Sequence, residues 1–144
     1  ALRVHLRGTP CRVLGSDMKL RIEAADCYYY PDLMVTCSPS LPVNQLEKTD
    51  ARLVVEVLSP STAAYDRGEK FANYRLLPSL QEYLLVDVDL LRCDLFRRGA
   101  DGLWVLHPFG PDDAVHLASV DLTVPAADLW ADLPPAATPA SAPA

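Results

Sequence analysis

Two carboxylates and one ammonium group in the first half of the chain are its clearest candidates for chemistry. Asp32 opens a largely apolar run at residues 32–37, and Glu56 lies inside a second run at residues 53–58. Lys70 follows in the polar-faced segment after this second run. A charged side chain inside a buried strand is costly unless it is paired or binds a metal. Glu56 therefore breaks the local pattern in the way that functional sites do.

The two carboxylates could bind one metal ion if their strands are neighbours. Adjacent strands lie ~4.8 Å apart, so Asp32 and Glu56 would converge. Such an oxygen-rich set suits magnesium or manganese, which can generate a hydroxide nucleophile and stabilise charge on a phosphoryl oxygen. The alternative interpretation is structural: Asp32 caps a strand turn, and Glu56 pairs with an arginine or lysine.

Lys70 also has two interpretations. Asp66 lies four residues before it, and a helical ion pair of this spacing contributes only ~0.3–0.5 kcal/mol. In the functional interpretation, the ammonium group points at a phosphate or an attacking water beside Glu56. A lysine suits this role because it is a mobile point charge with three hydrogen-bond donors.

A strand–helix–strand unit must position these groups. The continuous apolar run at residues 53–58 predicts a strand buried on both faces. A helix is predicted over residues 63–77, ended by Pro78, and a third buried strand over residues 81–87. This order predicts parallel pairing of the two strands through a right-handed crossover.

The flanking segments predict additional, mostly antiparallel, structure. We expect residues 11–14 and 19–24 to form one hairpin, and residues 92–97 and 103–107 to form another around a glycine-containing turn. The remaining predicted elements are helical turns at residues 1–7, a strand at 32–37, an edge strand at 115–118 and a short helix at 125–131. The predicted fold class is therefore α/β with a mixed sheet.

The length of 144 residues fits a single domain. We assign residues 1–133 to it and expect it to be incomplete at the N-terminus, because residues 1–7 read as the end of a helix. Residues 134–144 are rich in Pro and Ala, carry no charge and predict a disordered tail. Residues 38–50 are polar and predict an exposed connection.

Charge and cysteine usage limit the class of protein. The net charge of -6 argues against a basic protein that coats nucleic acid, but not against an enzyme that meets it through a local patch and metal ions. The absence of a signal peptide or membrane-length apolar run predicts a cytoplasmic protein without a membrane partner. The four cysteines form no zinc-binding pattern, and we expect buried, reduced thiols.

An aromatic and basic segment precedes Asp32. Residues 28–30 are three consecutive tyrosines, which could stack on bases but more often pack at a strand edge. Lys19 and Arg21 share a face of the predicted strand at residues 19–24. They could contact phosphate, although a solvated strand face is the simpler interpretation.

Four motifs together resemble one protein family. They are Tyr30-Pro-Asp32, Leu53-Val-Val-Glu-Val-Leu-Ser-Pro-Ser-Thr62, Asp66-Arg-Gly-Glu-Lys70 and Gln81-Glu-Tyr-Leu-Leu-Val-Asp87. The segment from about residue 2 to 124 resembles the Uma-two family of restriction endonucleases, within the PD-(D/E)XK nuclease superfamily. The resemblance implies a restriction-endonuclease-like fold, with a mixed four-stranded sheet flanked by helices, to which this chain adds an antiparallel hairpin.

The resemblance also implies site roles. Asp32 matches the acid of the Pro-Asp motif and Glu56 the second acid, and both would bind Mg²⁺ or Mn²⁺ with the carbonyl of Val57. The superfamily lysine would stand at position 58, which is Leu58 here, so its role passes to Lys70. The family also has a leading helical segment with an acidic residue, and this chain begins after that segment.

Three functions are compatible with these features. The first is a metal-dependent endonuclease that hydrolyses DNA through Asp32, Glu56 and Lys70. The second is a catalytically inactive nuclease-fold module that binds nucleic acid or protein. The third is a homodimeric structural subunit that pairs through the exposed edge of the hairpin at residues 92–107.

Overall fold

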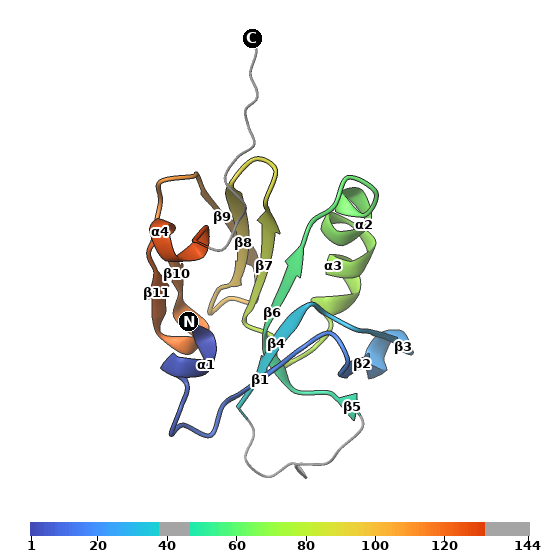
Figure 1. The fold of residues 1–144 in the computed structure, drawn as a ribbon. Helices are drawn as coiled ribbons and strands as arrows, with labels where there is room; N and C mark the ends of the chain where they lie inside the picture. Colours follow the sequence, from blue (N-terminus) through green and yellow to red (C-terminus); the bar gives the residue numbers. More distant parts are fainter. Residues whose placement is uncertain (38–46, 132–144) are drawn as a thin grey trace.

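A mixed six-stranded sheet forms the centre of the molecule (Figure 1). The computed structural model describes residues 1–37 and 47–131. The strand order is β1-β4-β6-β7-β8-β9, in which only β6 and β7 run parallel. The strands are β1 (Arg12–Leu14), β4 (Leu33–Thr36), β6 (Ala51–Val57), β7 (Glu82–Asp87), β8 (Arg92–Arg98) and β9 (Trp104–Phe109). The predicted α/β class with a mixed sheet is confirmed, and β1 and β9 widen the expected four-stranded core on both sides.

The helical crossover between β6 and β7 is two short helices instead of the predicted single one. These are α2 (Ala63–Arg67) and α3 (Glu69–Tyr74), and Gly68 separates them. The backbone of Gly68, with φ -100° and ψ -89°, lies outside the helical region. Glycine is a poor helix former, so this is where the helix breaks. The break lies between Asp66 and Lys70, two of the charged residues of this segment.

One face of the sheet is covered by α2, α3 and a small three-stranded sheet of order β3-β2-β5 (Figure 1). Its strands are β2 (Lys19–Ile22), β3 (Cys27–Tyr29) and β5 (Glu47–Lys48), and a short 3-10 turn (Glu23–Ala25) joins β2 to β3. The core on this side includes Phe71, Tyr74 and Tyr83, with Leu20 and Ile22 from β2. This aromatic core fixes the distance between the helices and β6.

The other face is covered by α1 (Leu2–His5), by a hairpin of β10 (Val115–Leu117) and β11 (Leu122–Val124), and by α4 (Ala126–Leu129). Glu82 is fully buried on β7 and anchors the hairpin. Its carboxylate accepts backbone N–H bonds from Ala118 (3.1 Å) and Ser119 (2.8 Å) in the 3-10 turn (Ala118–Val120), and it contacts Arg97 at 2.8 Å. The predicted strand at residues 115–118 therefore exists but pairs with β11, not with the edge of the main sheet.

The predicted hairpin of residues 11–14 and 19–24 is wrong. β1 pairs with β4 in the central sheet, with Arg12 opposite Thr36, while β2 pairs with β3. This pairing places Cys11 opposite Cys37, and the two form a disulfide with a Cα–Cα distance of 3.9 Å. The expectation of four reduced thiols is wrong for this pair, because it rested on the burial tendency of free cysteines and the predicted hairpin did not bring Cys11 and Cys37 together.

The other two cysteines are free thiols. Cys93 is buried on β8, and burial raises the pKa of its thiol to about 11.

The predicted hairpin of residues 92–97 and 103–107 is confirmed as β8 and β9, with Arg97 opposite Val105. The predicted tail at 134–144 and most of the connection at 38–50 lie outside the described residues. None of the helices in the described part of the chain is long and apolar enough to cross a membrane.

Candidate active site

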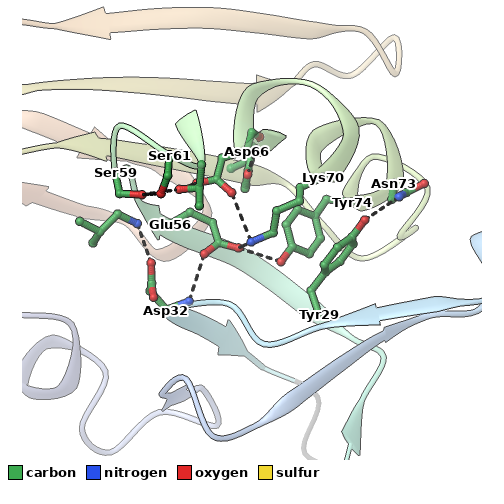
Figure 2. Close-up of polar contacts among 12 residues, drawn as sticks. Tyr29, Asp32, Glu56, Ser59, Ser61, Asp66, Lys70, Asn73 and Tyr74 are labelled. Atoms are coloured by element: carbon green, nitrogen blue, oxygen red, sulfur yellow. Dashed lines mark hydrogen bonds and ion pairs between the residues drawn. The ribbon is translucent and has the colours of Figure 1, made fainter. Parts of the chain in front are cut away.

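The two candidate carboxylates meet at the carboxyl end of β6 (Figure 2). β4 and β6 are antiparallel with Leu33 opposite Val55, so Asp32 lies beside Glu56. The backbone N–H of Asp32 donates to Glu56 Oε1 at 3.3 Å, and the N–H of Val57 donates to Asp32 Oδ2 at 2.7 Å. Glu56 is only 3% exposed, whereas Asp32 is exposed. One carboxylate is thus held inside the protein and the other at its surface, with direct hydrogen bonds between their segments.

Lys70 extends from α3 to the same point. Its Nζ lies 2.7 Å from Glu56 Oε2 and 3.3 Å from Asp66 Oδ1. Both contacts weighed for Lys70 are therefore present at once: the helical ion pair with Asp66 and the approach to Glu56. The same geometry provides Glu56 with the basic partner that the structural interpretation requires. These distances do not test catalysis, so the catalytic role of Lys70 stays a prediction.

Asp66 is a member of this cluster that the sequence interpretation treated only as an ion-pair partner. It is 4% exposed, and its Oδ2 accepts a hydrogen bond from Thr62 Oγ1 at 3.3 Å. Ser59 Oγ lies 2.8 Å from the same Thr62 hydroxyl and 3.2 Å from the hydroxyl of Ser61. A chain of polar contacts thus runs from the exposed loop after β6, through Asp66 and Lys70, to Glu56 (Figure 2).

Two tyrosines complete the surroundings of Lys70 and Glu56. Tyr74 donates its hydroxyl hydrogen to Glu56 Oε2 at 2.9 Å, and the ring of Tyr29 lies 5.4 Å from Lys70 Nζ. Asn73 donates to the hydroxyl oxygen of Tyr29 at 2.7 Å, which fixes that ring. The sequence interpretation missed Tyr74, although its spacing of four residues from Lys70 places both on one helix face.

Burial sets the protonation of the cluster. Burial raises the pKa of Glu56 above its ordinary value, against the opposing effects of Lys70, of the Tyr74 hydroxyl and of the Asp32 N–H. For Lys70, burial lowers the pKa but contact with Glu56 and Asp66 more than offsets it, so the pKa is raised overall. Lys70 therefore stays a cation at neutral pH. Burial and the nearby Glu56 carboxylate also raise the pKa of Tyr74, so its hydroxyl remains a donor.

Two contacts fix α2 against the sheet and so position Asp66. The hydroxyl of Tyr83 on β7 donates to the backbone carbonyl of Asp66 at 2.8 Å. Arg67 contacts the buried carboxylate of Asp94 on β8 at 2.5 Å. The helix that carries Asp66 is therefore tied to two neighbouring strands.

The donor set of Asp32, Glu56 and the Val57 carbonyl fits a hard divalent cation, because all three supply oxygen. Asp32 Oδ1 accepts no hydrogen bond from any described residue, and its side chain is exposed. Residues 1–37 and 47–131 contain no group of three or more His, Cys, Asp or Glu that could hold a metal. Backbone carbonyl and water would therefore supply the remaining ligands, as Mg²⁺ commonly allows.

Position 58 cannot supply an ammonium group to this site. Leu58 is 7% exposed and packs in the core between the sheet and the helices. Its backbone N–H donates to the carbonyl of Val86 at 2.8 Å. Among the lysines of the described residues, the one in contact with Glu56 is Lys70.

The mixed sheet and the helical crossover that brings Lys70 to Glu56 define an α/β domain. Residues 1–130 match the Uma2 family, which is described as "Putative restriction endonuclease", and the chain belongs to that family.

Two relatives come from Synechocystis sp. (strain PCC 6803), and both are uncharacterized proteins. The protein slr1290 is 42% identical over 119 residues, which cover 83% of this chain and 63% of the relative. The protein sll1609 is 42% identical over 96 residues, which cover 65% of this chain and 54% of the relative. The chain thus spans less than two thirds of the length of either relative.

A solved structure shares the fold. It is described as "a putative nuclease belonging to DUF820" from Anabaena variabilis. The TM-score is 0.74, and the match covers 90% of this chain and 74% of the other chain at 16% identity. At this identity the likeness concerns the fold.

Proposed function

We propose that this chain is the nuclease domain of a Mg²⁺- or Mn²⁺-dependent endonuclease that hydrolyses phosphodiester bonds in DNA. The observation that carries the proposal is the contact of Lys70 with Glu56, beside Asp32, at the end of β6. Family membership supports the same class of activity.

Each residue has a distinct role in this proposal. Asp32, Glu56 and the Val57 carbonyl would hold the metal, which when bound supplies an activated water and stabilises charge on the phosphate. Lys70 has three donors, and its contacts with Glu56 and Asp66 aim the ammonium group at the carboxyl end of β6. From there it would donate to a phosphate oxygen or hold the attacking water. Tyr74 orients Glu56 through Oε2 and leaves Oε1 facing Asp32.

The polar network supports a lysine donated by the helix. The buried Leu58 occupies the position at which the superfamily has its lysine. Lys70 on α3 is therefore the cation that reaches Glu56, the second acid of the motif. Asp66 restrains Lys70 from the same helical segment. We propose that the lysine has moved from the strand to the helix while its ammonium keeps its place beside Glu56.

The test is nicking of supercoiled plasmid in Mg²⁺ or Mn²⁺, with EDTA as the blank. Glu56→Gln removes the charge and keeps the size of the side chain, and we expect it to abolish nicking. Lys70→Met should do the same. Glu69→Gln is the matched control, because Glu69 neighbours Lys70 in sequence but is exposed. Nicking by Glu56→Gln at the rate of the unaltered protein would refute the proposal.

A non-catalytic module remains the second candidate. The observation that favours it is that both oxygens of Glu56 already accept protein contacts, from Asp32, Tyr74 and Lys70. Calorimetry with Mn²⁺ separates the two candidates. Heat of binding that disappears in Glu56→Gln supports the enzyme, whereas a folded protein that binds no Mn²⁺ supports the module.

We also propose a homodimer, formed through the outer edge of the central sheet. β9 is the last strand of that sheet, and exposed apolar side chains lie on or beside it: Leu103, Val105 and Leu106. An unpaired strand edge of this kind favours pairing with a second copy. A monomeric mass by light scattering would contradict this part of the proposal.

A further inference from the structure

The three consecutive tyrosines before the candidate site face two different ways. Tyr29 points inward, to Lys70 and to the ring of Tyr74 at a centroid distance of 5.1 Å. Tyr28 and Tyr30 are 50% and 49% exposed. Successive side chains of an extended segment alternate between its faces, which explains the division. Tyr29 therefore packs against the core, whereas its two neighbours keep much of their ring surface open to solvent.

The two exposed rings and a lysine form a corner on the outer face of β2 and β3. The centroids of Tyr28 and Tyr30 lie 5.9 Å apart, with the ring planes at 89°. Lys19 Nζ lies 4.4 Å from the centroid of Tyr28 and forms no ion pair with a carboxylate of the described residues. The other cation of this face, Arg21, is already paired with Asp26 at 2.7 Å. Lys19 is therefore the cation available to a ligand.

This corner adjoins the candidate active site. Only Pro31, which is buried, separates Tyr30 from Asp32. Proline restricts both its own backbone and that of the residue before it to extended conformations. Two extended steps span ~7 Å, so the Cα atoms of Tyr30 and Asp32 lie within about that distance of each other.

We propose that Tyr28 and Tyr30, together with Lys19, form a stacking subsite for unpaired nucleobases next to the bond that is cleaved. The proposal rests on the proposed function in one respect, that nucleic acid is the substrate. Lys19 Nζ lies over one face of Tyr28, so the other face of that ring and the ring of Tyr30 would each stack on one base, while the ammonium group would contact phosphate. Stacking on aromatic side chains is tolerant of base identity.

The subsite favours single-stranded over double-stranded nucleic acid. Bases in a duplex are stacked on their neighbours and paired, so their faces cannot reach Tyr28 or Tyr30. A single strand, or the frayed bases beside a nick, presents those faces freely. We therefore expect single-stranded DNA to bind more tightly than the duplex of the same length.

The test is fluorescence anisotropy with a labelled single-stranded oligonucleotide in EDTA, which prevents cleavage. The matched ligand is an oligonucleotide of the same length in which the central nucleotides are abasic. It keeps the phosphates and removes the stacking partners. We expect the double variant Tyr28→Ala/Tyr30→Ala to weaken binding of the normal strand by at least about tenfold and to leave the abasic strand nearly unaffected.

Two further variants separate stacking from folding. Tyr28→Phe/Tyr30→Phe keeps the rings and should retain binding, and Leu90→Ala removes an exposed apolar side chain far along the sequence and should also retain it. Three results would overturn the proposal: unaltered binding by the Ala double variant, equal losses with both oligonucleotides, or no binding of single strands by the unaltered protein.

The two proposals can fail separately. Base-dependent binding by Glu56→Gln, together with undiminished plasmid nicking by that variant, would refute the nuclease site and retain the stacking subsite. Loss of nicking in Glu56→Gln, with normal oligonucleotide binding by the Ala double variant, would support the nuclease site and refute the stacking subsite.

Discussion

Lys70 Nζ lies 2.7 Å from Glu56 Oε2, and the two side chains are 13% and 4% exposed. Each side chain is the nearest group of opposite charge to the other. Burial makes it energetically costly for either of them to be charged. Removing one member of such a pair leaves the other buried without compensation. The stability of the fold and the chemistry of the candidate site therefore depend on the same contact.

Replacing Lys70 should destabilise the protein in a way that depends on pH. Lys70→Met should lower the free energy of unfolding by about 3 kcal/mol at pH 8, because Glu56 is left as an unpaired buried anion. The loss should be smaller at pH 5, where Glu56 can take up a proton. Urea unfolding at both pH values measures it. Adding Glu56→Gln to Lys70→Met should recover much of the stability at pH 8, and an equal loss at the two pH values would contradict the explanation.

The raised pKa of Glu56 predicts a second pH dependence. A carboxyl group whose pKa is raised by folding stabilises the protein fully below its unfolded value of 4.5 and loses that contribution as the pH rises through the folded pKa. Glu56→Gln stays neutral throughout. Its free energy of unfolding, relative to that of the unaltered protein, should therefore increase as the pH rises above 4.5. Chemical unfolding across this range tests the sign, and the opposite trend would mean that folding lowers the pKa.

Asp32→Asn should separate metal binding from folding. The asparagine side chain can still accept the hydrogen bond from the Val57 N–H, so we expect little change in stability. It loses the charge that a divalent cation needs, and Mn²⁺ affinity should fall at least about tenfold. Calorimetric titration with Mn²⁺ measures this, with Glu69→Gln as the control of equal charge change. Unchanged Mn²⁺ affinity would remove Asp32 from the ligand set.

The disulfide predicts a thiol count and a stability change. Titration of the unfolded, unreduced protein should detect the thiols of Cys27 and Cys93 only. Cys11→Ser/Cys37→Ser should lower the free energy of unfolding by about 3 kcal/mol, and a reductant should destabilise the unaltered protein but not this variant. Four reactive thiols without reductant would show that the bond does not form in solution.

The strand–helix–strand unit could be predicted from the sequence, because apolar runs and a proline that ends a helix are short, continuous patterns. The adjacency of Asp32 and Glu56 was expected only on the condition that their strands are neighbours. The family motifs, not a local pattern, implied that the two acids share one site. The approach of Lys70 to Glu56 was also within reach, because the helix follows directly from the strand that carries Glu56.

What could not be predicted depends on contacts between distant segments. Nothing near residues 11–14 shows that β1 pairs with β4 and not with β2, so the disulfide was missed together with the pairing. The exposure of Tyr28 and Tyr30 depends on what covers β3, which periodicity does not reveal. The inclusion of Asp66 in the site depends on how α2 is turned relative to α3, because Gly68 breaks the helix between Asp66 and Lys70.

The disulfide has one more consequence, for the register of β4. A slip of one residue against β6 would turn Met34 out of the core and move Asp32 away from Glu56. Just beyond one end of β4, Cys37 is bonded to Cys11, the residue before β1. At the other end, hydrogen bonds join Asp32 to the end of β6. The disulfide prevents β4 from sliding along β1 even when their hydrogen bonds open transiently, so a slip of β4 against β6 would have to carry the edge strand β1 with it.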